Sequence, residues 1–189
     1  MLKSEENERK RRQTALAIES RRTLIERWEG DDVKRYPKWE ARAKLAAELL
    51  EPGCRVADVG CGGMTMETLL PPGAVYVPFD VCRRDDRTNV IDLNSEPFPI
   101  VNVDAILCLG VLEYLFDPLA FIHEARKSNC LLIFSYHPID FGEPTDRRVK
   151  NWVSDLSLPS ILSACFAAGY RQVNVKPSLP KEYLFSAKC

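Results

Sequence analysis

A glycine-rich turn at the end of a short apolar run constrains the fold of this chain most strongly. The run 55–59 is followed by Gly60, Gly62 and Gly63. Glycine lets the backbone take positive φ and approach a ligand closely, and a strand entering such a turn is typical of nucleotide-binding parallel sheets. A second apolar run ends about 20 residues later at Asp80, a spacing that suits a carboxylate on ribose hydroxyls. Together these features predict a site for an adenosine-containing cofactor.

The pattern of glycines distinguishes between cofactors. A dinucleotide-binding turn carries Gly-x-Gly-x-x-Gly, so that a pyrophosphate can sit on the helix N-terminus. Here Thr65 stands where the third glycine would be, and Asp58 precedes the first glycine by two residues. A carboxylate in the turn repels an anion, whereas it attracts an amino group and a sulfonium. The turn therefore favours S-adenosylmethionine over NAD, which leaves a nicotinamide dehydrogenase as the weaker alternative.

Four features occur in an order and at a spacing that one enzyme family shows. They are the turn 58–63, Asp80, the segment 90–93 and the segment 104–118. In these features the chain resembles class I S-adenosylmethionine-dependent methyltransferases of the small bacterial, methyltransferase-11-like type. The resemblance implies a Rossmann-like, doubly wound α/β fold, with a mostly parallel sheet of about seven strands and a C-terminal antiparallel strand. It also implies S-adenosyl-L-methionine as cofactor and S-adenosyl-L-homocysteine as product.

The chain departs from the family pattern at two positions. Met64 stands where the glycine loop usually has another glycine, and Tyr114 stands where the best-populated group has histidine. The first departure leaves an alternative open, in which the chain is a binding or scaffold protein that keeps the fold without catalysis.

Size and composition are those of one globular domain. The chain has 189 residues, of which 46% are hydrophobic, and a net charge of −1. This balance gives no reason to expect nucleic acid or a membrane surface as partner, and no run approaches the ~20 apolar residues of a membrane span. The seven cysteines include no Cys-x-x-Cys pair, and there are two histidines. We therefore expect free thiols, no metal site and a cytoplasmic location.

The N-terminal part of the chain is expected to be helical. Residues 1–30 are rich in Arg, Lys and Glu, and the apolar spacing predicts a second helix over 37–50. We predict a helical extension over 1–50, packed on a cofactor-binding domain over 51–189. Three interpretations of the first helix remain open: a solvated surface helix, an oligomer contact, and a flap over the substrate site.

Turn-forming residues interrupt the segments that normally supply crossover helices. The helix after the glycine turn is predicted to be short, over 64–70, and the segments 81–88 and 94–101 are too polar or too rich in proline for helices. We therefore expect the N-terminal helices to cover one face of the sheet. Further elements are predicted as strands over 104–109 and 130–134, helices starting after Asp117 and Ser157, and a hairpin of 171–175 with 182–187.

The cofactor residues are assigned from the resemblance and from side-chain chemistry together. Asp58 and the glycine turn are expected at the methionine end, Asp80 at the ribose hydroxyls and Asp92 at the adenine edge. The end of the strand 104–109 is expected beside the sulfur. The predicted set is Asp58, Gly60, Cys61, Gly62, Asp80, Val81, Asp92, Leu93, Leu109 and Gly110. The alternative for each acid is a helix cap or a turn former.

The catalytic candidates lie near the predicted carboxyl edge of the sheet, where ligands bind in such folds. Tyr136, His137 and Asp140 follow the strand 130–134, and His137 is placed to take a proton from a hydroxyl. Tyr114 is expected beside the methyl channel, with Glu113 as a polar contact or a helix cap. The alternative for His137 is an ordinary surface-loop histidine.

The acceptor candidates are basic and aromatic. Arg83 and Arg84 follow the second predicted strand, and Arg147, Arg148 and Trp152 lie in a long loop. Arginine suits carboxylates and phosphates, so an anionic acceptor is one hypothesis, and Trp152 offers a stacking face. The alternative is solvated loop charge paired with Asp85, Asp86 and Asp146.

The sequence thus predicts a methyltransferase that methylates a hydroxyl group of a small molecule or glycan. The resemblance to stand-alone bacterial enzymes also suggests polysaccharide biosynthesis, with an oligomer formed through the N-terminal helices as one option. The alternative remains the non-catalytic scaffold.

Overall fold

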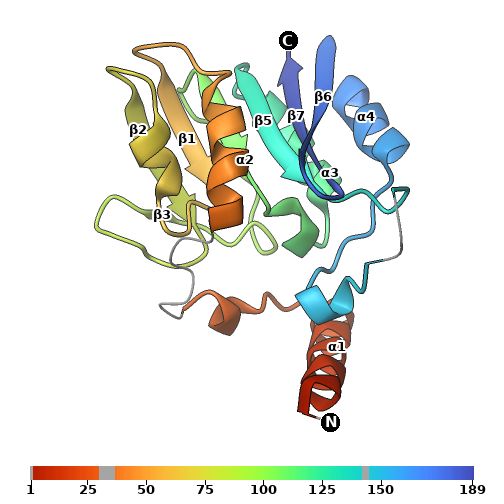
Figure 1. Cartoon of the computed structure of the whole chain (residues 1–189). Helices are drawn as coiled ribbons and strands as arrows, with labels where there is room; N and C mark the ends of the chain where they lie inside the picture. The colour runs from red at the N-terminus through yellow and green to blue at the C-terminus, as the bar shows by residue number, and fades with distance from the viewer. Residues whose placement is uncertain (1, 30–36, 142–144) are drawn as a thin grey trace.

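The computed structural model describes residues 2–29, 37–141 and 145–189 (Figure 1). Seven strands form one sheet in the order β3-β2-β1-β4-β5-β7-β6. The strands are β1 (Arg55–Val59), β2 (Val75–Asp80), β3 (Asn89–Val90), β4 (Ala105–Cys108), β5 (Leu131–Tyr136), β6 (Gln172–Leu179) and β7 (Glu182–Lys188). The pairs among β1 to β5 are parallel, whereas β7 pairs antiparallel with β5 and β6. This confirms the Rossmann-like sheet with antiparallel strands at its C-terminal side.

Four α-helices and four 3-10 helices are described around this sheet. The α-helices are α1 (Leu2–Ser20), α2 (Pro37–Ala47), α3 (Pro118–Arg126) and α4 (Leu158–Ala167). The 3-10 helices are η1 (Ile25–Arg27), η3 (Thr65–Leu69), η4 (Leu112–Tyr114) and η5 (Arg148–Lys150). As predicted, the segment after the glycine turn forms only a short helix, and no helix covers 81–88 or 94–101.

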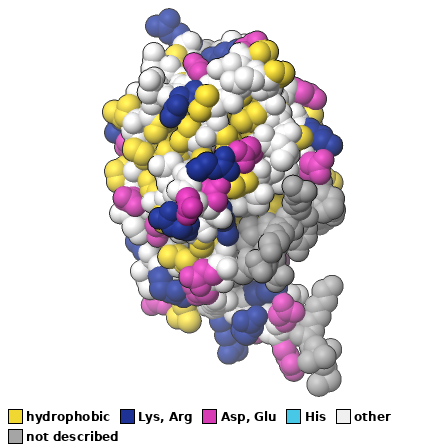
Figure 2. Space-filling view, turned by 90° about the vertical axis from the view of Figure 1, so that its left-hand side faces the viewer, with side chains coloured by type: hydrophobic (Ala, Val, Ile, Leu, Met, Phe, Trp, Pro, Cys, Tyr) yellow, Lys and Arg dark blue, Asp and Glu magenta, His cyan; other side chains and the backbone are white. Residues whose placement is uncertain are grey.

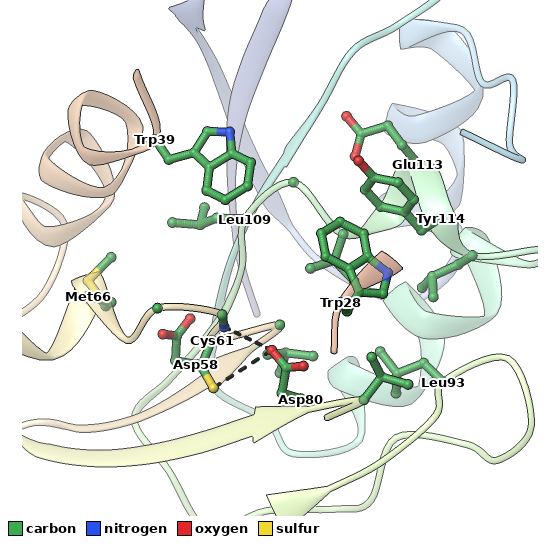
Figure 3. Close-up of a pocket in the computed structure, with 18 of the residues that line it drawn as sticks. Trp28, Trp39, Asp58, Cys61, Met66, Asp80, Leu93, Leu109, Glu113 and Tyr114 are labelled. Atoms are coloured by element: carbon green, nitrogen blue, oxygen red, sulfur yellow. Dashed lines mark hydrogen bonds between the residues drawn. The ribbon is translucent and has the colours of Figure 1, made fainter. Parts of the chain in front are cut away.

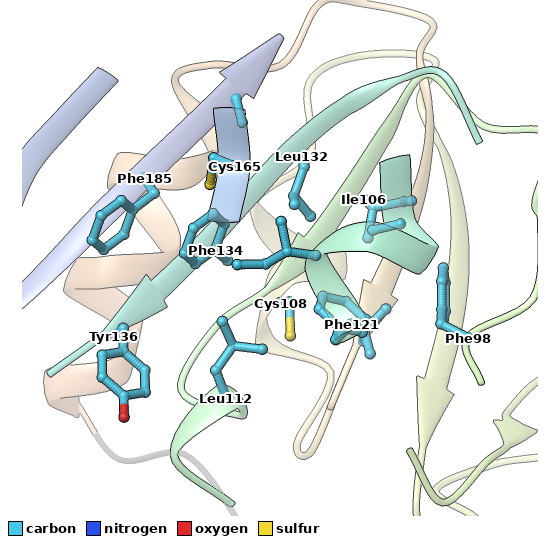
Figure 4. Close-up of a cluster of buried hydrophobic side chains, with 14 of the residues drawn as sticks. Phe98, Ile106, Cys108, Leu112, Phe121, Leu132, Phe134, Tyr136, Cys165 and Phe185 are labelled. Carbon is cyan, nitrogen blue, oxygen red and sulfur yellow. The ribbon is translucent and has the colours of Figure 1, made fainter. Parts of the chain in front are cut away.

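Alternating residues of the central strands fill two separate cores. In β1, Ala57 and Val59 face the core beneath α3 and α4, while Val56 faces the core beneath α2. This period of two is the geometry of a strand that is buried on both faces. In the larger core the rings of Phe134 and Phe185 stack at 4.6 Å across β5 and β7 (Figure 4).

Local capping explains where α3 and α4 begin. The Asp117 side chain accepts a hydrogen bond from the backbone of Ala120, and the Ser157 side chain accepts one from the backbone of Ser160. Each helix also has proline in its first turn, where a missing N–H costs nothing. These two predicted starts are confirmed.

The two N-terminal helices take different places. Helix α2 covers one face of the sheet through Ala43, Ala46 and the following Leu50 (Figure 1). Helix α1 instead lies against η5, where the Thr14 hydroxyl donates to the Arg148 carbonyl at 2.8 Å. Only α2 therefore supplies the sheet cover expected of this part of the chain, and the domain boundary at residue 50 stays a prediction.

Two strand ends differ from the sequence expectation. Strand β5 continues through Tyr136, whereas the sequence placed Tyr136 beyond the strand. Strand β6 runs through Pro177 with a register shift before Leu179, so this proline does not end it. Both extensions follow from pairing with β7, whose hydrogen bonds override local propensity.

The cysteines form no disulfides, and the surface carries charges of both signs (Figure 2). All seven cysteines are free. On the face shown in Figure 2, acidic and basic side chains are interspersed among apolar ones. Among the described residues, no helix is both long and apolar enough to cross a membrane.

Candidate active site

A single pocket at the carboxyl edge of the parallel strands brings the predicted cofactor residues together (Figure 3). Parallel pairing places Asp58 of β1 beside Pro78 of β2, so that Asp58 and Asp80 end neighbouring strands at the same edge. All of the cofactor residues predicted from the sequence line this pocket: Asp58, Gly60, Cys61, Gly62, Asp80, Val81, Asp92, Leu93, Leu109 and Gly110. Their placement agrees with the prediction, while their roles toward a cofactor stay proposals.

The glycine turn is held by backbone hydrogen bonds and by close packing. Gly60 has φ of +75°, and a Cβ on it would lie 2.2 Å from the Val111 side chain. The amides of Gly60 and Cys61 both donate to the Phe79 carbonyl, at 2.8 and 3.0 Å. Met64 has φ of 54°, in the left-handed region. Met64 therefore adopts the left-handed backbone conformation that usually favours glycine at this position of the loop.

Asp58 is a buried carboxylate at the floor of the pocket. Oδ2 of Asp58 accepts a hydrogen bond of 2.6 Å from the Tyr76 hydroxyl, and Asp58 is 5% exposed. Burial raises the pKa of Asp58 to about 6, and the Tyr76 hydrogen bond opposes part of that rise. A cationic ligand group beside Asp58 would stabilise the ionised form.

Asp80 organises the turn and already has a cationic neighbour. Its Oδ2 accepts from the Gly62 amide at 2.8 Å, and its Oδ1 accepts from Arg84 Nη2 at 2.9 Å. Arg84 Nη1 also donates to the Trp28 carbonyl at 2.7 Å. The predicted ribose acid is thus linked through one arginine to the N-terminal segment.

Thr23 and Trp28 form a wall of the pocket that the sequence prediction did not include. The Thr23 hydroxyl donates to Asp92 Oδ1 at 2.9 Å, although these residues are far apart in the chain. The rings of Trp28 and Tyr114 meet edge to face with centroids 4.8 Å apart, and both line the pocket (Figure 3). Of the three interpretations of the N-terminal helix, the flap over the substrate site comes nearest to this arrangement, and it stays a prediction.

His137 lines the same pocket and pairs with a buried acid. Its Nδ1 lies 2.9 Å from Glu113 Oε1, and its backbone amide donates to the same oxygen at 3.0 Å. The Trp152 ring packs against the imidazole, with centroids 4.6 Å apart. Of the catalytic candidates, the structure brings His137 and Tyr114 to the pocket.

Tyr136 and Asp140 have structural surroundings instead. Tyr136 is fully buried, and its hydroxyl is hydrogen bonded to Ser154 Oγ at 3.0 Å. The two carboxylate oxygens of Asp140 share the backbone N–H of Leu158 at the start of α4, at 3.1 and 2.9 Å. Neither lines the pocket. The expectation that Tyr136 belongs to the catalytic group fails because β5 carries its side chain into the core.

The predicted acceptor residues divide in the same way. Arg84 and Trp152 line the pocket, whereas Arg83, Arg147 and Arg148 do not. Both loop arginines pair with Asp155, at 2.8 Å and 2.5 Å. The loop charge is therefore paired with an aspartate, although the partner is Asp155 and not one of the aspartates that the alternative named. Asp146 pairs with Arg11 instead.

The pocket combines aromatic walls with an excess of acidic groups. Its carboxylates belong to Asp58, Asp80, Asp92 and Glu113, while its guanidiniums belong to Arg42 and Arg84. Arg42 is already engaged by Glu182 and by the Leu109 carbonyl. The aromatic side chains are those of Trp28, Trp39, Tyr114 and Trp152.

Comparison with curated proteins finds distant relatives of one kind. A probable S-adenosylmethionine-dependent methyltransferase of Mycobacterium tuberculosis, present in two strains, is 26% identical over 161 residues. The match covers 75% of this chain and 58% of the relative, so the chain spans less than two thirds of the relative's length. No protein-family model matches the chain.

Comparison with solved structures confirms the fold. A SAM-dependent methyltransferase from Aquifex aeolicus aligns with a TM-score of 0.60 and 19% identity, covering 82% of this chain and 94% of that one. A Burkholderia thailandensis 1,6-didemethyltoxoflavin-N1-methyltransferase, solved with its toxoflavin compound and S-adenosylhomocysteine, aligns with a TM-score of 0.61 and 15% identity. That match covers 94% of this chain and 85% of the other.

Proposed function

We propose that this chain is an S-adenosylmethionine-dependent methyltransferase that methylates a hydroxyl group of a small molecule or glycan. The observation that carries the proposal is one pocket that joins the glycine turn, the acids at the ends of neighbouring strands and a histidine paired with a buried glutamate. The names of the distant relatives and the fold of the solved structures support the same activity.

Different residues of the pocket suit the different chemical groups of this cofactor. Asp58 would face the amino group and the sulfonium, because a buried carboxylate with a raised pKa gains most from a nearby cation. Asp80 would accept hydrogen bonds from the ribose hydroxyls, and Asp92 with Leu93 would face the adenine. When bound, the cofactor supplies a methyl group that its sulfonium activates for in-line displacement.

The protein contributes positioning and one proton acceptor. Holding the acceptor oxygen in line with the methyl group can lower the barrier by roughly 7–11 kcal/mol. His137 Nε2 would take the proton that the acceptor hydroxyl loses on methylation. Tyr114 and Trp152 flank this position as aromatic walls.

The charges of the pocket favour an uncharged acceptor over an anionic one. Of the arginines that suggested an anion, only Arg84 lines the pocket, and its guanidinium is bound to Asp80 and to the Trp28 carbonyl. An anionic acceptor would also approach several carboxylates, which costs free energy in a partly buried site. A hydroxylated ring, aromatic or sugar, would suit the aromatic walls.

The cellular location, the domain division and the oligomeric state belong to the same proposal. We place the enzyme in the cytoplasm, with the domain division at residue 50, and an oligomer through the N-terminal helices remains one option. A role in polysaccharide biosynthesis would require a glycan among the accepted substrates.

The test is methyl transfer from labelled S-adenosylmethionine to a panel of phenols, sugars and carboxylated analogues. The proposal expects label in at least one uncharged hydroxyl compound, with S-adenosylhomocysteine formed in equal amount. Failure of S-adenosylmethionine to bind at millimolar concentration in calorimetry would instead support the scaffold alternative. Label found only in carboxylates or phosphates would contradict the assignment of the acceptor class.

A further inference from the structure

Two buried carboxylates lie beside the imidazole of His137. Glu113 Oε1 is 2.9 Å from Nδ1, and Glu182 Oε1 is 4.0 Å from the same atom. Glu113 is 1% exposed and Glu182 is fully buried, whereas the side chain of His137 is 22% exposed. The three residues come from η4, from β7 and from the position just after β5, so the sheet itself brings them together.

The charge of Glu182 is already balanced. Its Oε1 accepts hydrogen bonds from Arg42 Nη1 at 2.5 Å and from Ser135 Oγ at 2.8 Å. Its Oε2 accepts one from Ser178 Oγ at 3.1 Å. Because Arg42 supplies a full positive charge, Glu182 needs no second cation.

Glu113 has a different environment. Within the described parts of the chain it forms no ion pair with lysine or arginine, and its Oε2 is buried without a hydrogen-bond partner. A buried carboxylate oxygen left in this state costs on the order of 1–3 kcal/mol. Arg147 lies nearby and donates to the His137 carbonyl, but it pairs with Asp155. Among the residues that the structure describes, the side chain that can supply positive charge to Glu113 is therefore His137 in its protonated form.

We infer that Glu113 is a positioning residue that fixes the tautomer and the orientation of the His137 imidazole. A carboxylate oxygen can only accept here, so Nδ1 carries hydrogen and Nε2 keeps its lone pair for the pocket. The Trp152 ring restricts rotation of the imidazole. When His137 takes a proton, the charged imidazole forms an ion pair with the buried carboxylate of Glu113. This inference rests on the proposed role of His137 as proton acceptor.

The alternative role for the same three side chains would be to bind a divalent cation. Ligand atoms of Glu113, His137 and Glu182 all lie within 4.8 Å of one another, which is a spacing that metal ligands also show. The guanidinium of Arg42 sits on Glu182, however, and would repel a metal ion at that place. The geometry therefore favours the histidine–glutamate pair over a metal site.

Nitrogen-15 NMR of the imidazole rings tests the inference without any acceptor. The chain has only two histidines, so His137→Gln assigns the signals and leaves His123 as an internal reference. In alkaline buffer, where imidazole is neutral, we expect His137 of the wild-type protein to be the Nδ1–H tautomer. In Glu113→Gln, whose amide can donate as well as accept, we expect a substantial Nε2–H fraction.

Turnover and metal addition complete the experiment. Glu113→Gln should lower kcat about 10-fold or more, but by no more than the loss of the base itself, with the affinity for S-adenosylhomocysteine unchanged. Glu124→Gln on α3, where Glu124 pairs with Lys127, serves as the control. An Nε2–H tautomer in the wild-type protein would overturn the inference even if Glu113→Gln fails to fold. Shifts of the His137 signals on adding Mg²⁺ or Zn²⁺ would also overturn it, in favour of a metal site. An Nδ1–H tautomer together with a fully active His137→Ala variant would refute the base in the proposed function but leave the orienting contact intact.

Discussion

The Tyr76 hydroxyl donates a hydrogen bond of 2.6 Å to Oδ2 of Asp58 across neighbouring parallel strands. Apart from this bond, the Asp58 carboxylate is enclosed by the pocket floor, where it is 5% exposed. Desolvation dominates over it, and so the pKa of Asp58 rises from 3.8 to about 6. Asp58 therefore destabilises the fold in its ionised form while it prepares a place for a cation.

Asp58 should give the ligand-free protein a distinctive pH dependence. Between about pH 4 and 6 the folded state binds more protons at Asp58 than the unfolded state, so stability falls as the pH rises. The contribution of this residue is on the order of 3 kcal/mol when complete. In urea unfolding, the free energy of unfolding of wild type should therefore fall relative to that of Asp58→Asn as the pH rises through this window. Parallel curves for the two proteins would refute the raised pKa.

Cofactor binding should release protons from the same carboxyl group. A sulfonium or amino group beside Asp58 lowers its pKa, so protein near pH 6 must lose part of a proton on binding S-adenosylmethionine. Calorimetry in buffers of different ionisation enthalpy measures this directly. The proton release should disappear in Asp58→Asn, and its persistence there would assign it to another group.

The glycine turn should tolerate no side chain at Gly60. Gly60 and Gly53 have nearly equal φ, +75° and +76°, but only at Gly60 would a Cβ collide, with the Val111 side chain. Gly53→Ala should cost about 1–2 kcal/mol from backbone strain alone, and Gly60→Ala about 1–3 kcal/mol more from overpacking. Chemical denaturation of both variants gives the difference. Equal losses would show that Val111 moves aside.

His137 should affect turnover and leave cofactor affinity unchanged. His137→Ala is expected to lower kcat about 10²-fold or more, because a positioned proton acceptor is lost. His123→Ala, on the exposed side of α3, is the matched control. The best acceptor from the panel serves as substrate in both assays. Full activity of His137→Ala would leave positioning alone as the mechanism.

The sequence predicted the parts of the site that depend on local chemistry. The glycine turn, Asp80 and the caps Asp117 and Ser157 are short-range signals whose residue types have few other uses. Positions after strands were also predictable, because parallel strands end at one edge.

Contacts between segments that are far apart in the chain could not be predicted from the sequence. Thr23 reaches Asp92, and Arg84 reaches the Trp28 carbonyl, but no periodicity links these positions. The long-loop arginines looked available until the fold placed Asp155 beside them. Likewise, Tyr136 lies in the core because β7 pairs with β5 along its whole length.

Calorimetric titration of S-adenosylhomocysteine into wild type, Asp80→Ala and Asp86→Ala tests the central claim most directly. Asp80 should lose charge-assisted hydrogen bonds to the ribose worth roughly 1.5–3 kcal/mol, which weakens Kd about 10- to 150-fold. Asp86 is exposed in the same loop and controls for charge alone. Thermal melting must first show that Asp80→Ala is folded, because this side chain also binds the Gly62 amide. One-site binding by wild type with this loss confined to Asp80→Ala is the predicted result. Equal affinity of all three proteins, or no binding by wild type at millimolar ligand, would contradict the account.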